Sequence, residues 1–352
     1  MKQTSRNYAY DVLRVLAILL VLFCHKYSYS APELLDTIDL PYILALCLSI
    51  LYKCGPPLFL MISGALLLGK TESFKTIFFH RILRFLILMV LCTLVVCLIH
   101  LHNRFEFRVE LIFFGGLNWY LYAYLAFLCM LPFLRLIAQH ADGSQRVLYL
   151  ILAAVFYSVS GIFLYAGLDA RLLDNMPLFN TVYASNCWHL IFPLAGYFIA
   201  EVIKEGDAAK VRKLTLWTSV VAVLNLVQGE VLFSLDRFVK EGVNLEMMRQ
   251  HAGFGPTCLI FLLILRFTNS SRIEAHPKGA WVLRELSGAT LGVFLIETHT
   301  NFSGLLSLQI VKWSFLADLP YTRAILAVAI EFVVYSLTVM LLRRIPGIKK
   351  LL

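Results

Sequence analysis

Long apolar segments alternate with short polar ones along the whole chain. Ten of the apolar segments have the length of a helix that crosses a bilayer, about 20 residues. The chain is therefore predicted to be an all-α integral membrane protein with about ten transmembrane helices. The ten segments lie near residues 10–30, 42–68, 83–101, 117–137, 146–166, 188–203, 214–234, 252–267, 286–304 and 323–342.

The polar segments between the predicted helices leave no room for a separate soluble domain. No internal repeat, low-complexity tract or Gly/Ser linker interrupts the pattern. We therefore expect residues 1–352 to form a single polytopic membrane domain. The first apolar segment is not expected to be a cleaved signal peptide, because it is long, lacks a small-residue cleavage site and contains His25 and Lys26.

The composition agrees with a membrane protein. Of the 352 residues, 60% are hydrophobic and only 15% are charged, whereas soluble domains are about 25% charged. The eight cysteines lie mostly within the predicted spans and include no C-x-x-C pair. Cysteine usage therefore predicts neither a metal site nor a disulfide framework.

The basic residues are distributed unevenly, and this predicts the orientation. With the N-terminus inside, Lys and Arg are about three times as frequent in the inner segments as in the outer ones. An even number of spans then places the C-terminus in the cytoplasm as well. This asymmetry accounts for most of the net charge of +9, so we expect no nucleic-acid partner.

The first apolar segment carries an ionisable residue near each end, Arg14 and His25. At about 100° per residue, the interval between them is close to three whole turns, so both side chains share one face about 16 Å apart. Asp11, one turn before Arg14, is spaced to pair with its guanidinium. Taken alone, His25 is best explained by a hydrogen bond to a neighbouring helix; its place on the face of Arg14 favours a functional role.

The second apolar segment contains Gly55-Pro56-Pro57, which must break or kink its helix because proline lacks a backbone donor and clashes with the preceding turn. Broken helices are tolerated at membrane depth where they line a cavity. Lys53 is expected at about the depth of His25, where it serves a site or snorkels to the outer surface. The small residues at 63–65 would let another helix approach closely.

The ninth and fourth segments carry further candidates. Glu297 lies in an apolar run and is harder to explain by packing than His299, which faces a different side of the helix. Trp119 and Tyr120 begin the fourth segment; they belong to the interfacial aromatic belt or bind a sugar substrate.

The motifs of these segments together resemble the acyltransferase type 3 family of bacterial integral membrane proteins. NYAYDVLRVLAILLVLFCH resembles the R-x10-H first helix of that family, and GPPLFLMISGALLL its V-P-L-F-F-M-I-S-G segment. FFHRILRFLI is similar to its basic inner loop, and WYLYAYLAFLCMLPFLR to its W-Y-L-Y segment. The ninth segment departs from the family, because Glu297 stands where the family tends to carry a histidine.

The resemblance implies an O-acyltransferase of the bacterial cytoplasmic membrane. Such an enzyme moves an acyl group, commonly acetyl, from cytoplasmic acyl-CoA to a hydroxyl of an envelope carbohydrate. Acyl-CoA would be a co-substrate, with no tightly bound cofactor and no metal, and the partners would be the bilayer and the glycan acceptor. Basic residues at the inner side would bind the phosphates of CoA: Arg14 and Arg84 above all, with Arg81, Lys70 and Arg135.

The reaction itself would use His25 as the general base that deprotonates the acceptor hydroxyl. Glu297 would orient or stabilise the imidazole, and Lys53 would offset the charge of the oxyanion. A covalent acyl-histidine relay is also compatible with this sequence. The rival interpretations are a transporter or flippase of a lipid-linked glycan or small metabolite, which would share the spans and buried charges, and a sensing or scaffolding membrane domain. The acceptor, the acyl group, the side of transfer and the oligomeric state stay open.

Overall fold

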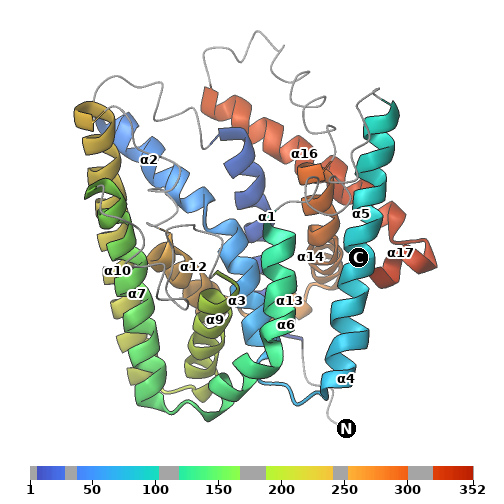
Figure 1. Cartoon of the computed structure of the whole chain (residues 1–352), viewed down its shortest axis with the longest axis horizontal. Coiled ribbons are helices and arrows are strands. Elements are labelled where there is room, and N and C mark those ends of the chain that lie inside the picture. Colours follow the sequence, from blue (N-terminus) through green and yellow to red (C-terminus); the bar gives the residue numbers. More distant parts are fainter. Residues whose placement is uncertain are drawn as a thin grey trace. The chain divides into compact units, whose positions relative to one another are not determined.

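A computed structural model of the chain describes residues 6–27, 38–102, 119–166, 188–240, 253–299 and 320–351, and these residues form helices joined by short turns. The helices are α1 Ala9–Tyr27, α2 Leu40–Tyr52, α3 Gly55–Leu67, α4 Phe74–Ile77, α5 Leu83–His102, α6 Trp119–His140, α7 Gly143–Ala166, α9 Trp188–Glu205, α10 Ala208–Leu235, α12 Phe254–Phe267, α13 Ser270–Glu274, α14 Pro277–His299, α16 Pro320–Leu342 and α17 Pro346–Leu351. Two π-helical turns, η2 Phe78–Ile82 and η4 Asp236–Lys240, adjoin α5 and α10 (Figure 1).

Each of the ten predicted spans is helical over most of its described length. Within the described ranges, six helical segments are long and apolar enough to cross a membrane: Leu40–Leu67, Phe74–Val95, Trp119–His140, Ala208–Val239, Pro277–Thr298 and Ala324–Leu342. Two further apolar helices are shorter, Gly143–Val159 and Phe254–Phe267. The chain is thus an all-α, multi-pass membrane protein, while the number ten and the cytoplasmic termini stay predictions.

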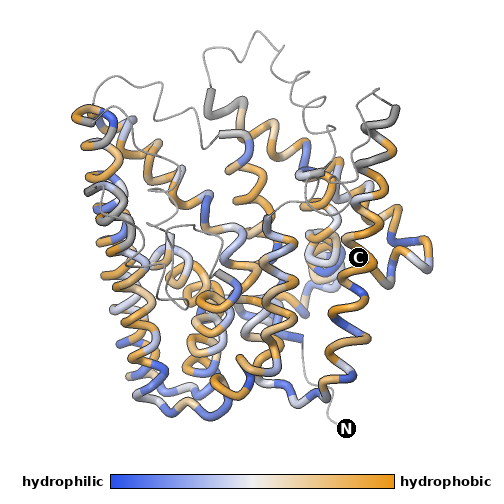
Figure 2. Tube along the Cα trace, viewed as in Figure 1, coloured by the Kyte–Doolittle hydropathy of each residue, from blue (hydrophilic) through white to orange (hydrophobic). Residues whose placement is uncertain are grey.

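The two faces of α10 show how a helix is arranged for a lipid environment. Its buried face carries polar or small residues, including Thr218 and Asn225, whereas Val220, Val223 and Val227 are exposed. This is the reverse of a helix in water, because lipid solvates apolar side chains and leaves polar groups to bond inside the protein. Figure 2 shows hydrophobic residues along most of α7 and α10, with hydrophilic residues at the turns joining α6 to α7 and α9 to α10.

The helices group into two compact units, each made of two stretches of the sequence. The first unit comprises Met1–Lys70 and Met130–Pro277, and the second comprises Thr71–Cys129 and Lys278–Leu352. The expectation of a single domain stays a prediction, and each unit is described by itself.

In the first unit, glycines bring helices into close contact. A Cβ on Gly64 of α3 would collide with the backbone of Pro193 in α9, and one on Gly196 of α9 would collide with the backbone of Met61. α10 meets α12 in the same way, since a Cβ on Gly255 would lie 2.7 Å from backbone atoms of α10. The predicted close approach at the small residues 63–65 is therefore confirmed, with α9 as the partner (Figure 1).

The predicted break in the second apolar segment is also present. α2 ends at Tyr52 and α3 begins at Gly55, so two residues separate the helices, and they run in different directions (Figure 1). Pro56 and Pro57 occupy the first turn of α3, where a missing backbone N–H costs little. Lys53 follows the last residue of α2, and its backbone N–H bonds back to carbonyls of that helix.

In the second unit, α14 packs against α16. A Cβ on Gly292 of α14 would lie 2.6 Å from the side chain of Val339, and one on Gly288 would lie 2.5 Å from Arg343. Gly292 lies four residues after Gly288 on α14, whereas its partner Val339 of α16 lies four residues before Arg343, which directly follows α16. The chain therefore runs in opposite directions along these two contacting surfaces.

Candidate active site

A cluster of three charged residues marks the start of α1. Arg6 binds the carboxylate of Asp11 through two hydrogen bonds, Nε to Oδ2 at 2.7 Å and Nη2 to Oδ1 at 2.8 Å. Arg14 Nη1 lies 3.3 Å from the same Oδ1, which confirms the predicted pair with Asp11. Asp11 is buried, and its hydrogen bonds raise the pKa of Arg6. The carboxylate therefore holds two guanidinium groups side by side.

Arg14 and His25 lie on one unbroken helix. α1 continues from Ala9 to Tyr27, so the helical spacing of about 16 Å along the axis applies to the two residues. The Arg14 side chain is 29% exposed, and His25 is exposed near the other end of α1. The helix thus presents a cation near its start and an imidazole near its end.

The break between α2 and α3 lies beside the end of α1 that carries His25. The rings of Phe23 in α1 and Tyr52 at the end of α2 stack with centroids 5.1 Å apart and planes 12° apart. Gly55, at the start of α3, packs against α1 as well. Lys53 stands between these two contact points and is buried. Lys53 therefore lies near the last turns of α1, and its expected depth in the membrane, level with His25, stays a prediction.

The other two phosphate candidates of the first unit differ in their surroundings. Lys70 is exposed just after α3. Arg135 is buried, and its Nε donates a hydrogen bond to the carbonyl of Leu67 at 3.0 Å. Gln139, one turn later on α6, donates to the carbonyl of Leu68 at 2.7 Å. These side chains satisfy carbonyls at the end of α3 that have no partner within the helix, so Arg135 has a structural task there.

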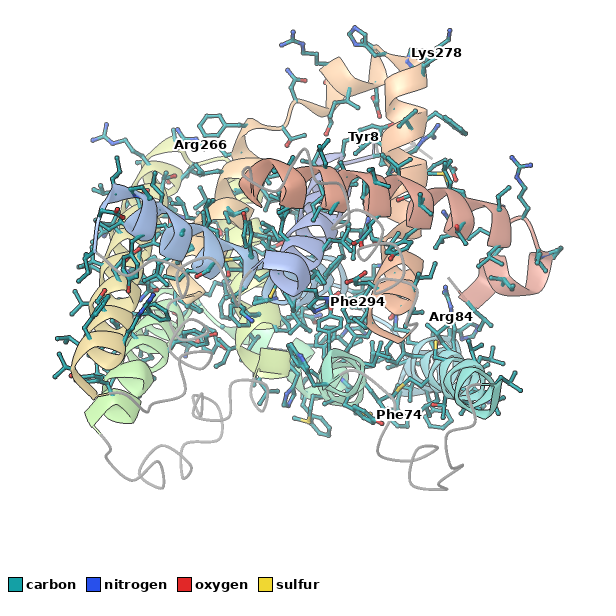
Figure 3. The ribbon with its side chains drawn as sticks, turned by 90° about the horizontal axis from the view of Figure 1, so that it is seen from above. Tyr8, Phe74, Arg84, Arg266, Lys278 and Phe294 are labelled. Carbon is teal, nitrogen blue, oxygen red and sulfur yellow. The ribbon has the colours of Figure 1, made fainter. Side chains whose placement is uncertain are left out.

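In the second unit, Arg81 and Arg84 stand at the junction of η2 and α5. Arg81 forms an ion pair with Glu72, with Nη2 to Oε1 at 2.6 Å and Nε to Oε2 at 3.0 Å. Arg84 is exposed, and its Nη2 donates to the carbonyl of Leu351 in α17 at 3.3 Å (Figure 3). Arg84 is therefore the more accessible of the two arginines.

The aromatic candidates lie against the helix that carries Glu297. Trp119 and Tyr120 pack edge to face at 5.9 Å, and Tyr120 packs in the same way on Phe294 of α14 at 5.3 Å. Trp119 is exposed and Tyr120 is buried. Glu297 is also buried, one turn after Phe294 on α14. The start of α6 and Glu297 thus belong to one neighbourhood of the second unit.

This unit contains a second buried carboxylate that was not predicted from the sequence, Glu331 of α16. Tyr335 lies one turn later on the same face, within electrostatic reach of both Glu331 and Glu297. The hydroxyl of Tyr335 is buried and has no hydrogen-bond partner among the described residues. The sequence could have indicated Glu331. It is an ionisable residue inside an apolar segment, and this same feature identified Glu297 as a candidate.

A polar cluster in the first unit was also missed, and it is structural. Asn225 of α10 donates to Ser158 of α7 at 2.6 Å and accepts from the backbone N–H of Gly255 in α12 at 2.9 Å. Gln228 donates to the carbonyl of Ser158 at 2.5 Å. These hydrogen bonds hold α7, α10 and α12 together. Within the described ranges, no group of His, Cys, Asp or Glu residues is placed to bind a metal ion.

Comparison with known families gives the chain an assignment. A family model described as an acyltransferase domain matches residues 7–342, nearly the whole chain. The chain therefore belongs to this acyltransferase family, which confirms the resemblance inferred from the motifs. Comparisons with curated proteins and with solved structures found no match. The transporter and sensor interpretations receive no support from these comparisons.

Proposed function

We propose that this member of the acyltransferase family moves an acyl group, in the simplest case acetyl, from cytoplasmic acyl-CoA to a hydroxyl of an envelope carbohydrate. The observation that carries the proposal is the pair of groups on α1. Asp11 holds Arg14 near the start of the helix, and His25 lies about 16 Å along the same helix. The enzyme would work in the bacterial cytoplasmic membrane.

The separation of Arg14 and His25 suits the shape of acyl-CoA. Its phosphates and its thioester lie at opposite ends of the molecule, joined by the thin pantetheine arm. A guanidinium binds phosphate through charge-assisted hydrogen bonds, and an imidazole is the usual general base near neutral pH. Arg14 would hold the phosphate end, and the arm would run along α1 towards His25.

At His25 the proposed reaction is a direct acyl transfer. Neutral His25 takes the proton of the acceptor hydroxyl while the hydroxyl oxygen attacks the thioester carbonyl carbon. The C–O bond forms, the C–S bond breaks, and the imidazolium returns its proton to the sulfur of CoA. In the acyl-histidine variant, an imidazole nitrogen attacks the thioester carbonyl carbon, the C–S bond breaks, and CoA leaves as the thiol with the N–H proton of the imidazole. The acceptor hydroxyl then attacks the acyl-imidazole, the C–N bond breaks, and the hydroxyl proton returns to the imidazole.

Lys53 would stabilise the oxyanion that forms on the carbonyl oxygen. It is buried at the break between α2 and α3, beside the end of α1 that carries His25. The N-terminal end of α3 begins two residues later, and a helix N-terminus carries partial positive charge. A buried cation beside such a helix end favours negative charge that develops in the transition state.

Residues of the second unit receive roles by their own chemistry. Arg84, which is exposed, would bind a phosphate of CoA, with Arg81 as its neighbour. The exposed ring of Trp119 would stack on the sugar of the acceptor, next to Tyr120. The carboxylate of Glu297, which is buried in an otherwise apolar stretch of α14, would assist the proton transfer, because ionisable residues within transmembrane helices are usually functional.

The test is mass spectrometry of envelope glycans from cells with the gene, without it, and with the gene carrying His25→Gln. We expect an acyl-sized mass difference on a glycan that requires the intact gene and disappears in the other two strains. Purified wild-type protein should also release the CoA thiol from acetyl-CoA when the identified glycan is added. Identical glycans in all three strains, together with no acyl-CoA binding, would rule out the proposed function.

A further inference from the structure

Arg6 is a charged residue at the start of α1 that the proposed mechanism does not use. It grips Asp11 from the side, through Nε and Nη2. Asp11 also contacts Arg14, so one oxygen, Oδ1, is shared by both guanidinium groups. Two positive charges therefore stand next to each other with a single carboxylate between them, and the three residues carry a net positive charge.

The grip on Asp11 leaves part of the Arg6 guanidinium available. A guanidinium has five N–H donors in a planar fork, and the bonds to Asp11 occupy the side formed by Nε and Nη2. The end of the fork, with Nη1, is not engaged by Asp11. The Arg6 side chain is 49% exposed, whereas that of Asp11 is 2% exposed. The carboxylate of Asp11 is thus enclosed, whereas the guanidinium of Arg6 faces outwards and keeps N–H donors that Asp11 does not use.

The backbone around Arg6 is held in place. The N–H of Tyr8 donates to Ser270 of α13 at 3.1 Å, and Tyr8 is buried (Figure 3). The side chain of Asn7 accepts a hydrogen bond from the N–H of Ala9 at 3.0 Å, at the first residue of α1. An arginine on an anchored segment loses little further freedom when it binds a ligand.

We propose that Arg6 and Arg14 together bind one phosphate group of acyl-CoA, with Asp11 as the positioning residue that sets Arg6 beside Arg14. This inference rests on the proposed function, and it adds Arg6 and Asp11 to the donor site. Phosphate is the ligand that fits, because it carries more than one negative charge and several acceptor oxygens for two guanidinium forks. Asp11 also lessens the repulsion between the arginines before the phosphate arrives.

The experiment measures ligand binding to the purified full chain in an uncharged detergent. The probes are CoA, which has phosphates, and pantetheine, which has none. The variants are Arg6→Gln and Arg6→Lys, with Arg272→Gln as the matched control. Arg272 is an exposed arginine on α13, the helix to which the Tyr8 backbone is bonded, so its loss changes the local charge equally.

We expect Arg6→Gln to weaken CoA binding about tenfold or more, the loss typical of a hydrogen bond to a charged group. Arg6→Lys should also bind CoA more weakly, by a smaller factor, because an ammonium group cannot form two hydrogen bonds with Asp11 and at the same time bind phosphate with a second pair of N–H donors. Pantetheine binding should be unchanged in both, and Arg272→Gln should bind CoA as the wild type does.

The positioning role of Asp11 is tested by kinetics. Asp11→Asn should raise the KM for acetyl-CoA several-fold and change kcat by less than about twofold, with no change in KM for the acetyl thioester of pantetheine. Equal changes in the KM of both donors would mean that Asp11 supports only the fold, which contradicts this assignment.

The results separate the inference from the function on which it rests. If the wild type binds no CoA, the proposed function fails. If the wild type binds CoA and Arg6→Gln binds it equally well, only the role of Arg6 is overturned. Should Arg6→Gln fail to fold, unchanged CoA affinity of Arg6→Lys would overturn it instead.

A lipid headgroup is the other source of phosphate at this position. Thermal stability is therefore compared in nanodiscs with and without phosphatidylglycerol. If Arg6→Gln loses stability only in the anionic discs and keeps its CoA affinity, the arginine binds lipid and the proposal is wrong. A loss of CoA affinity in lipid-free detergent supports CoA as the source.

Discussion

Gly64 of α3 and Pro193 of α9 lie so close together that a β-carbon on the glycine would overlap the backbone of the proline. Gly196 repeats the contact one turn further along α9, against Met61. Helices in membranes associate through such small residues, because lipid provides no hydrophobic drive between them and close packing must supply the attraction.

We expect Gly64→Ala to destabilise the protein by about 3 kcal/mol or more, at the upper end of overpacking costs, because backbone atoms cannot move aside as side chains can. Thermal unfolding in detergent measures the effect. Gly143→Ala is the control: it adds the same methyl group at the start of α7, where nothing lies within 4 Å. Equal melting temperatures of the two variants would contradict the close contact.

Both termini are expected in the cytoplasm, with ten spans between them, because basic residues concentrate in the segments that this orientation places inside. Reporter fusions at the C-terminus and in the polar segments between the helices measure the orientation directly. A C-terminal reporter that is active only outside the cytoplasm would refute an even number of spans with the N-terminus inside.

Arg84→Ala is expected to weaken acyl-CoA binding about tenfold, since it removes a charge-assisted contact with phosphate. The melting temperature should change little, because the Arg84 bond to Leu351 is exposed and long, at 3.3 Å. Arg344→Ala, at another exposed arginine of the second unit, serves as the control. Unchanged acyl-CoA affinity of folded Arg84→Ala would remove Arg84 from the donor site.

His25→Gln is expected to fold, to bind acyl-CoA and to transfer almost no acyl group. Glutamine keeps a polar, hydrogen-bonding side chain but is not a usable base, and loss of a general base typically costs about a hundredfold to ten-thousandfold in rate. Membrane abundance and melting temperature report the fold, and glycan acylation reports the reaction. Near-normal transfer by the folded variant would exclude His25 as the base; misfolding alone would indicate a structural histidine.

Asp142, which precedes α7, should make stability depend on pH in acid. It accepts bonds from the Ser144 hydroxyl and the Gln145 N–H, and these hydrogen bonds lower its pKa. A carboxyl whose folded pKa is lowered stabilises the fold above its unfolded pKa of about 3.9, and loses this contribution as pH falls through the folded pKa. Wild type should therefore melt above Asp142→Asn at pH 6, and the gap should narrow towards pH 3. If the difference in melting temperature between the two proteins does not change with pH, the ionisation of Asp142 does not contribute to stability.

Features that depend on neighbours in the sequence were predictable from the sequence alone. The helices follow from apolar runs, and the break after Tyr52 follows from two prolines that no continuous helix accommodates. The contact of Asp11 with Arg14 follows from their separation by one turn of α1. The motifs were enough to indicate the family, since they carry their chemistry in short, ordered segments.

Features that depend on which helices meet required the tertiary structure. The bond from Arg135 Nε to the carbonyl of Leu67 could not be predicted, because no periodicity links positions so far apart in the chain. The expected role of Arg135 at a phosphate stays a prediction. The grip of Arg6 on Asp11 depends on how the chain enters α1, where helical spacing does not apply. Gly64 predicted a close contact with some other helix, but the packing of α3 on α9 determines that Pro193 is its partner. Helix formation is a local property of the chain, whereas helix packing selects among many similar apolar surfaces.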